Sequence, residues 1–208
     1  MIEDLEFVQI FSAKIFHDLA GTLGAINSAI EFVQSEDVEV KNKALELMEL
    51  STNQANDRLR FLRYAYGISK YSGDADLDTV RELCLLLAKD KRIDIEFTPP
   101  GRLSNEKSMD VSKGKLIVCL ASLAKGALIH GGVVKISWLG DSSISILAEG
   151  NEVKELKDLH AIIKGEEYLD VPIAPSNVHA YYIYRLLETK KISLDIKSND
   201  TSITYTIK

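Results

Sequence analysis

The stretch of sequence that decides the fold is AKIFHDLAGTLGAINSAIE, residues 13–31. At about 100° per residue, the apolar side chains in and around it form one stripe along a helix, namely Leu5, Val8, Ile15, Phe16, Leu19, Leu23, Ile26, Ile30 and Val33. His17 points almost directly away from this stripe, towards a side of the helix made mostly of small residues. Two of them, Gly21 and Gly24, each cost roughly 1 kcal/mol relative to alanine inside a helix. Close approach by a partner would explain that cost.

A second helical pattern follows a break near Ser35 to Asp37, where Ser and Asp supply N-cap chemistry. Its apolar residues recur in steps of three and four, like a heptad seam: Leu45, Met48, Thr52, Ala55, Leu59, Leu62 and Tyr66. The two patterns together predict an antiparallel helical hairpin. Two helices alone expose too much apolar surface, and no further pair of long helices follows. We therefore expect a second copy of the chain to complete a four-helix bundle, which makes the protein a homodimer.

The polar segment 71–76 is the expected domain boundary, because the periodicity changes after it. It divides the chain into a helical-hairpin domain, 1–72, and an α/β domain, 73–208. The expected elements of the second domain are helices around 78–90, 112–130 and 176–188, a strand around 93–98 that Pro99-Pro100-Gly101 closes, and hairpins at 133–139 with 143–148 and at 192–197 with 202–207. The fold class is α+β.

Composition excludes several classes of protein. The chain has 208 residues, 46% of them hydrophobic, which is typical of a globular protein of one large or two small domains. Its formal charge of −6 is the opposite of a nucleic-acid-binding footprint. The acidic start, Met1 to Asp4, and the short uncharged run Leu19 to Ile30 favour neither a secretory signal nor a membrane span. We expect a cytoplasmic protein.

The cysteines and the other histidines have ordinary interpretations. Cys84 and Cys119 lie in apolar segments without metal-ligand spacing, which indicates core residues. His130 is expected to be a cation at the end of its helix, and His160 and His179 to be structural or surface residues. For His17 the stripe geometry argues against a core position, but a merely solvated side chain remains an alternative.

The identities of the residues around His17 indicate a function more specifically than its position on the helix does. Residues 16–23, FHDLAGTL, resemble the H-box of histidine-kinase dimerisation helices, in which a phosphorylatable His precedes an acid. Together with GAINSAIE at 24–31 and RLRFLRYAYG at 58–67, the chain is similar to the ChpT-like family of bacterial histidine phosphotransferases. The resemblance extends to the second domain, where the order of elements is that of a kinase-type ATP-binding fold without its ATP site.

Three ATP-site features of that kinase fold can be sought in the second domain. Residues 115–132 contain no Asn to position a metal. Residues 148–152, AEGNE, keep one glycine of the Asp-x-Gly-x-Gly turn but not its Asp. Residues 171–177, VPIAPSN, have no glycines to cradle phosphates. We expect no ATP-dependent kinase activity, no cofactor of the protein's own and no metal site.

The resemblance implies a phosphorelay enzyme that passes a phosphoryl group between receiver aspartates through His17, with Mg²⁺ supplied by the receiver. Asp18 then biases the imidazole tautomer or accepts a proton, although a solvated acid is an alternative. The expected receiver-docking surface is Ile10, Ala13, Lys14, Gly21, Gly24, Arg58 and Arg63. Ordinary solvation remains the alternative for the two arginines. Since Gly21 stands where kinases place a water-aligning Thr or Asn, phosphatase activity is in doubt.

The implied partners are the receiver domain of a hybrid histidine kinase and downstream response regulators, with the second domain as a binding platform. Two other functions stay open. One is an ATP-dependent histidine kinase with a divergent pocket, and the other is a non-catalytic dimeric scaffold or inhibitor that docks receivers or kinases.

Overall fold

The computed structural model describes residues 2–67, 74–89, 92–99, 108–140, 143–166 and 171–208. They form two compact units, Met1–Gly67 with Ile173–Val178, and Ile68–Pro172 with His179–Lys208. The predicted boundary between residues 72 and 73 lies outside the described residues.

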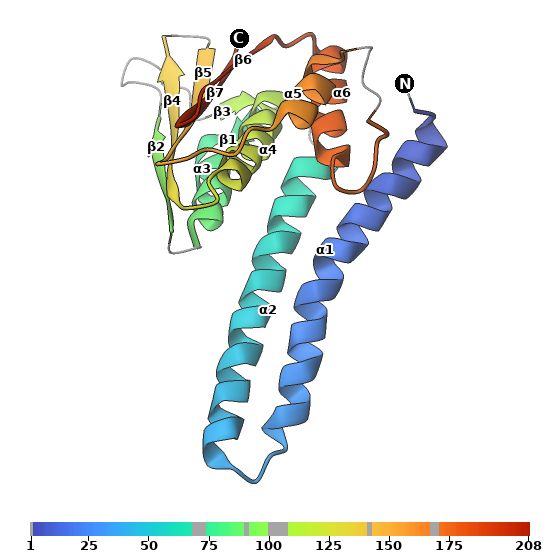
Figure 1. Ribbon diagram of the computed structural model, residues 1–208, viewed down its shortest axis with the longest axis vertical. Coiled ribbons are helices and arrows are strands. Elements are labelled where there is room, and N and C mark those ends of the chain that lie inside the picture. Colours follow the sequence, from blue (N-terminus) through green and yellow to red (C-terminus); the bar gives the residue numbers. More distant parts are fainter. Residues whose placement is uncertain (1, 68–73, 90–91, 100–107, 141–142, 167–170) are drawn as a thin grey trace. The chain divides into compact units, whose positions relative to one another are not determined.

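The first unit is built on a helical hairpin of α1, Asp4–Val33, and α2, Val38–Tyr66 (Figure 1). The helices are separate because Asp37 caps the start of α2, where its carboxylate accepts hydrogen bonds from the backbone N–H groups of Glu39 and Val40. The predicted hairpin and the predicted break near residues 35–37 are confirmed.

Small side chains let the two helices approach closely. Ala29 of α1 and Ala65 of α2 are completely buried, and Ala44, Ser51 and Leu62 are nearly so. Near the open end of the hairpin, the rings of Phe11 and Tyr66 meet edge to face with centroids 4.6 Å apart. The contact between α1 and α2 leaves many residues of the predicted apolar stripe exposed.

One edge of the stripe is exposed within the single chain. Its members are 47–69% exposed: Leu5, Val8, Phe16, Leu23 and Ile30. Helical geometry places Leu45 and Leu59 of α2, 41% and 46% exposed, on this same face of the hairpin. His17 lies on the opposite face. The hairpin therefore has one apolar face and one face that carries the histidine.

The second unit is a mixed five-stranded sheet with helices packed against it (Figure 1). The strand order is β2-β4-β5-β7-β6, in which only β2 and β4 are parallel. The strands are β2 Ile93–Thr98, β4 Gly132–Leu139, β5 Ser143–Glu149, β6 Leu194–Ser198 and β7 Ser202–Ile207. The helices are α3 Leu77–Leu86, extended by the 3₁₀ turn Leu87–Lys89, α4 Val111–Ala127, α5 Lys157–Lys164 and α6 Val178–Lys190.

The core lies between the helices and one face of the sheet. Alternate residues of the central strands are buried, as their period of two requires, and α4 is buried on nearly all sides. Cys84 and Cys119 are completely buried, which confirms that they are core residues. The predicted α+β class and the two predicted strand hairpins are confirmed; Asp141 of the first turn lies outside the described residues.

Several elements differ from the predictions. Neither α5 nor the two-stranded ribbon of β1, Asp74–Asp76, and β3, Ser108–Asp110, was predicted from the sequence. The last residues of these two strands cap α3 and α4, respectively, because Asp76 and Asp110 accept hydrogen bonds from the first backbone N–H groups of those helices. Strands of three residues are too short to show a period.

The expected helix at 112–130 was too long, and the interpretation of His130 as a helix-end cation was wrong. α4 ends at Ala127, because the next residue, Leu128, leaves the helical conformation with φ −89° and ψ 68°. Gly131 and Gly132 then turn the chain into β4 with φ of +90° and +148°. His130 lies beyond the helix, and its Nε2 is 3.5 Å from Oε2 of Glu152. None of the described helices combines the length and hydropathy needed to cross a bilayer.

Candidate functional site

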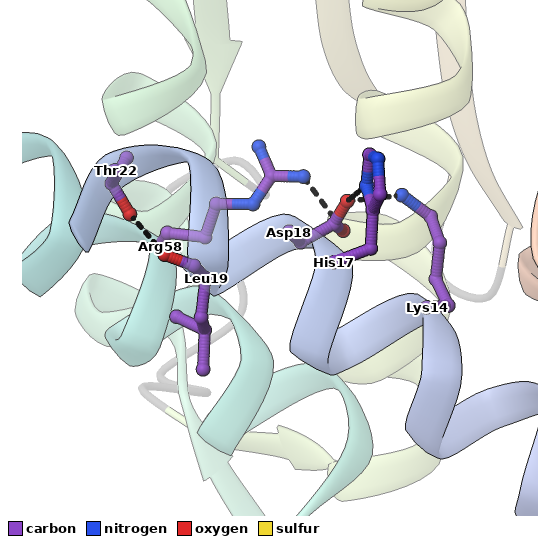
Figure 2. A network of polar contacts seen from close by, with 6 residues as sticks. All are labelled: Lys14, His17, Asp18, Leu19, Thr22 and Arg58. Atoms are coloured by element: carbon purple, nitrogen blue, oxygen red, sulfur yellow. Dashed lines mark hydrogen bonds and ion pairs between the residues drawn. The ribbon is translucent and has the colours of Figure 1, made fainter. Parts of the chain in front are cut away.

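His17 lies near the middle of α1 and projects into open space (Figure 2). Its side chain is 87% exposed. An imidazole in this position is accessible to another macromolecule without any movement of the hairpin. Of its two ring nitrogens, Nδ1 is the one directed towards the neighbouring acid, 3.8 Å from Oδ1 of Asp18. That distance is too long for a hydrogen bond.

Asp18 is held between the two helices. Its side chain is only 11% exposed, and both oxygens are engaged. Oδ1 accepts a hydrogen bond from Nζ of Lys14 at 2.5 Å, and Oδ2 is 2.6 Å from Nη2 of Arg58 on α2 (Figure 2). The alternative that Asp18 is a solvated acid is therefore wrong.

These contacts determine the charge state of Asp18. Partial burial acts to raise its pKa, but the hydrogen bonds and charges of Lys14 and Arg58 outweigh that effect and hold the pKa below its usual value. Asp18 is ionised at neutral pH. The two cations and one carboxylate leave a net charge of +1 beside His17.

The face around His17 is made of small residues and is open. Ala13 and Ala20 are exposed, and a Cβ atom added at Gly21 or Gly24 would meet nothing within 4 Å. Packing within the chain therefore does not require these two glycines. Ser12 and Thr22 carry the nearest hydroxyls along the helix, each five residues from His17. The hydroxyl of Thr22 donates a hydrogen bond to the carbonyl of Leu19 at 2.9 Å (Figure 2).

The predicted docking residues do not all form one cluster. Lys14 and Arg58 meet at Asp18, whereas the side chain of Arg63 is exposed further along α2. Ile10 is half-buried about two helical turns before His17. The interpretation of Lys14 and Arg58 as surface residues at the edge of a docking face missed their shared contact with Asp18.

Part of that contact had a sequence signal. Lys14 and Asp18 are four residues apart, the spacing at which side chains of one helix meet. No local spacing relates Arg58 to Asp18, because the two residues are 40 positions apart and only the hairpin register joins them.

The other described histidines form fold contacts. Nε2 of His160 lies 2.9 Å from the hydroxyl of Tyr205, and Nε2 of His179 lies 3.1 Å from the carbonyl oxygen of Cys119. The prediction that they are structural is confirmed. Within the described part of the chain, no group of three or more His, Cys, Asp or Glu side chains could hold a metal ion.

The two segments in which the sequence analysis sought a metal-positioning Asn and an Asp-x-Gly-x-Gly turn lie in α4 and in the loop after β5. α4 carries buried apolar residues along most of its length. The loop after β5 is tied to the turn between β6 and β7, because Gly150 N–H donates to Thr201 O at 3.0 Å and Val153 N–H to Asp200 O at 2.9 Å.

Comparisons with known proteins identify the family of this chain. Residues 77–202 match the family model of the histidine phosphotransferase C-terminal domain. The chain is 24% identical over 207 residues to the protein phosphotransferase ChpT of Brucella abortus (strain 2308), covering 97% of this chain and 94% of that protein.

The fold of this chain is similar to those of solved structures. A structure described as a bacterial phosphotransferase matches with a TM-score of 0.82 and 20% identity, covering 100% of this chain and 98% of the other. The Acinetobacter baumannii histidine kinase AdeS is a more distant match, with a TM-score of 0.43, 14% identity and coverage of 91% and 93%. Because the matched family model spans more than half of the chain, this protein belongs to the histidine phosphotransferase family defined by that C-terminal domain.

Proposed function

We propose that this chain is a phosphorelay histidine phosphotransferase in which His17 accepts a phosphoryl group from a receiver aspartate and passes it to a second receiver. The observation that carries the proposal is the exposed imidazole of His17 on an open face of small residues, in a chain of the histidine phosphotransferase family. Such a face lets a receiver bring its own active site against the histidine.

The chemistry needs no nucleotide. Phosphoryl transfer depends on positioning and on charge neutralisation more than on proton transfer. A receiver supplies Mg²⁺ and a lysine from its own site, so the histidine only has to offer a nucleophilic nitrogen. Nε2 of His17 is the nitrogen that faces away from Asp18, and we assign it as the phosphoryl acceptor.

We further propose that the working unit is a homodimer. The apolar face of the hairpin, with Phe16 69% and Leu23 54% exposed, is the surface that a second copy covers. Since His17 lies on the opposite face, dimerisation leaves it accessible to receivers. Gly21, Gly24, Ala13 and Ile10 then belong to the receiver-docking surface. Arg63 does not, because it follows Leu45 by about five turns of α2 and so shares the apolar face with it.

The direct test is phosphotransfer from radiolabelled, phosphorylated receiver domains of hybrid kinases from the same organism, with ATP omitted. We expect label on the native chain and on His130→Ala, but none on His17→Ala. His130 is the matched control because it is also an exposed histidine, with a side chain 64% exposed, in the second unit. The adduct should be acid-labile and base-stable.

Two results would contradict the proposal. Equal labelling of His17→Ala would place the phosphoryl group elsewhere. Binding of a receiver without any label on the native chain would favour a scaffold that docks receivers.

A further inference from the structure

Two cations from different helices converge on one carboxylate beside His17. Asp18 receives Lys14 on one oxygen and Arg58 on the other, at 2.5 and 2.6 Å. The carboxylate is nearly buried, whereas Lys14 remains 30% and Arg58 44% exposed. The cations are thus held in place on their inner side and accessible on their outer side.

This arrangement makes Asp18 a poor proton acceptor. Both of its oxygens already accept charge-assisted hydrogen bonds, and its lowered pKa opposes protonation. Its Oδ1 is also 3.8 Å from Nδ1 of His17, beyond hydrogen-bond distance. What the geometry does achieve is to fix two positive groups beside the imidazole.

We propose that Asp18 is a positioning residue that holds Arg58 and Lys14 beside His17, and that these two cations bind the phosphoryl group once His17 carries it. They would thereby determine how the phosphoryl group is distributed at equilibrium between His17 and a receiver aspartate. This inference rests on the function proposed above.

The transfer step balances without a proton acceptor. The lone pair of Nε2 of His17 forms the N–P bond, the P–O bond to the receiver aspartate breaks, and its electron pair leaves with the aspartate carboxylate. Nδ1 keeps its proton throughout. Before transfer the imidazole is neutral and gives the cations little to bind. After transfer the ring carries one positive charge and the phosphoryl group two negative charges, so the modified side chain has a net charge of −1 and phosphoryl oxygens that the cations can bind. Arg58 and Lys14 therefore stabilise the phosphorylated form selectively.

Arginine has the hydrogen-bonding capacity for both contacts. A guanidinium carries five N–H donors in a planar fork, and the ion pair with Asp18 is made through Nη2. The remaining donors can serve phosphoryl oxygens while the ion pair persists.

Equilibrium and rate measurements separate this role from docking. A residue that only helps a receiver to dock changes how fast phosphotransfer equilibrates, but not where it settles, since the end states are the free proteins. A residue that binds the phosphoryl group on His17 changes the end point itself.

The experiment uses the full chain and a radiolabelled phosphorylated receiver, without ATP, followed until the ratio of phosphohistidine to phosphoaspartate is constant. We expect Arg58→Gln to lower that ratio about tenfold, the size of one charge-assisted hydrogen bond, and Arg58→Lys to restore most of it. Arg60→Gln is the matched control, since it removes the same charge two positions further along α2 and so on another side of the helix. Its ratio should equal that of the native chain.

A double-mutant cycle tests the positioning role of Asp18. If Asp18 acts through Arg58, the effect of Arg58→Gln on the ratio should be smaller in an Asp18→Asn background than in the native chain. Equal effects in both backgrounds would overturn that role.

The other outcomes are also decisive. An unchanged ratio for Arg58→Gln with slower equilibration would make Arg58 a docking residue only and overturn the inference, while the proposed function stands. If Arg60→Gln lowered the ratio of phosphohistidine to phosphoaspartate as much as Arg58→Gln, the effect would reflect the total charge of the chain. That result would also overturn the inference. Failure of the native chain to take label would instead refute the proposed function itself.

Discussion

At the scale of single residues, the contrast between His17 and His160 illustrates how surroundings decide what a histidine does. His17 is 87% exposed on a helix surface, whereas the side chain of His160 is buried and bound to the hydroxyl of Tyr205. Burial lowers the pKa of His160, Lys164 acts in the same direction, and Glu155 opposes it. His160 is therefore kept neutral in the folded protein.

This buried histidine predicts a pH dependence of stability. The unfolded chain binds a proton at its ordinary pKa of 6.5, whereas the folded chain binds it only at lower pH. The stabilisation that comes from keeping His160 neutral is fully present above the pKa of the unfolded chain. It is lost as the pH falls from there through the pKa of the folded chain, because the unfolded state then binds more protons than the folded state. Urea unfolding at about pH 7.5 and about pH 5.5 should show a larger loss of stability in the native chain than in His160→Gln. Equal losses would mean that His160 does not titrate differently in the two states.

At the scale of elements, α1 carries two glycines whose cost is not repaid by packing inside the chain. Because their added Cβ atoms would meet nothing within 4 Å, Gly21→Ala and Gly24→Ala should each raise the free energy of unfolding by up to ~1 kcal/mol through helix propensity. The same methyl groups would hinder a receiver that approaches His17. We therefore expect more stable proteins that transfer phosphoryl groups more slowly.

Denaturant titration and the initial rate of labelling measure the two effects. Gly126→Ala is the control, since it also lies in a helix, α4, with no atom within 4 Å of its added Cβ. It should gain stability without losing transfer rate. If Gly21→Ala and Gly24→Ala transferred as fast as the native chain, the open face would not be the receiver-docking surface.

The apolar face of the hairpin gives a second prediction at this scale. Leu23→Glu would place a charge where we expect a second copy to pack, and burying an unpaired charge is costly. Light scattering should therefore give the mass of a dimer for the native chain and of a monomer for Leu23→Glu. Leu139→Glu is the matched control, because Leu139 on β4 is 53% exposed and Leu23 is 54% exposed. A native monomer would contradict the proposed dimer.

At the scale of the whole molecule, the second unit is a layered α+β domain in which the segments expected from the sequence to lack an ATP site take part in packing. α4 is filled with buried apolar side chains, and backbone hydrogen bonds fasten the loop after β5 to the turn at residues 200–201. The cysteines share this packed interior, where burial raises the pKa of Cys84 to about 12.

The resulting prediction concerns the source of the phosphoryl group. Labelled ATP with Mg²⁺ should leave the native chain unlabelled over the time in which a phosphorylated receiver labels it fully. Isothermal calorimetry with ATP should likewise give no binding heat. Label from ATP that disappears in His17→Ala would instead identify a histidine kinase with a divergent pocket.

The sequence by itself determined the parts of the protein whose signals are local. The hairpin follows from a helical stripe and the Asp37 cap, and the strands of the sheet follow from their alternation. The prediction that His17 is functional came from the resemblance of residues 16–23 to an H-box, since its place opposite the stripe left a solvated side chain open. The strands β1 and β3 were missed because three residues cannot establish a period of two, and α5 was missed because its eight residues make only about two helical turns.

Only the tertiary structure decided which residues contact Asp18 beside His17. Spacing along one helix brings Lys14 to Asp18, but Arg58 reaches it from the other helix, at a distance of 40 positions in the sequence. Which residues meet across a hairpin depends on the length of its turn and on how small side chains such as Ala29 and Ala65 let the helices settle against each other. The register of the two helices depends on how their side chains pack, and no local segment of the sequence predicts that packing.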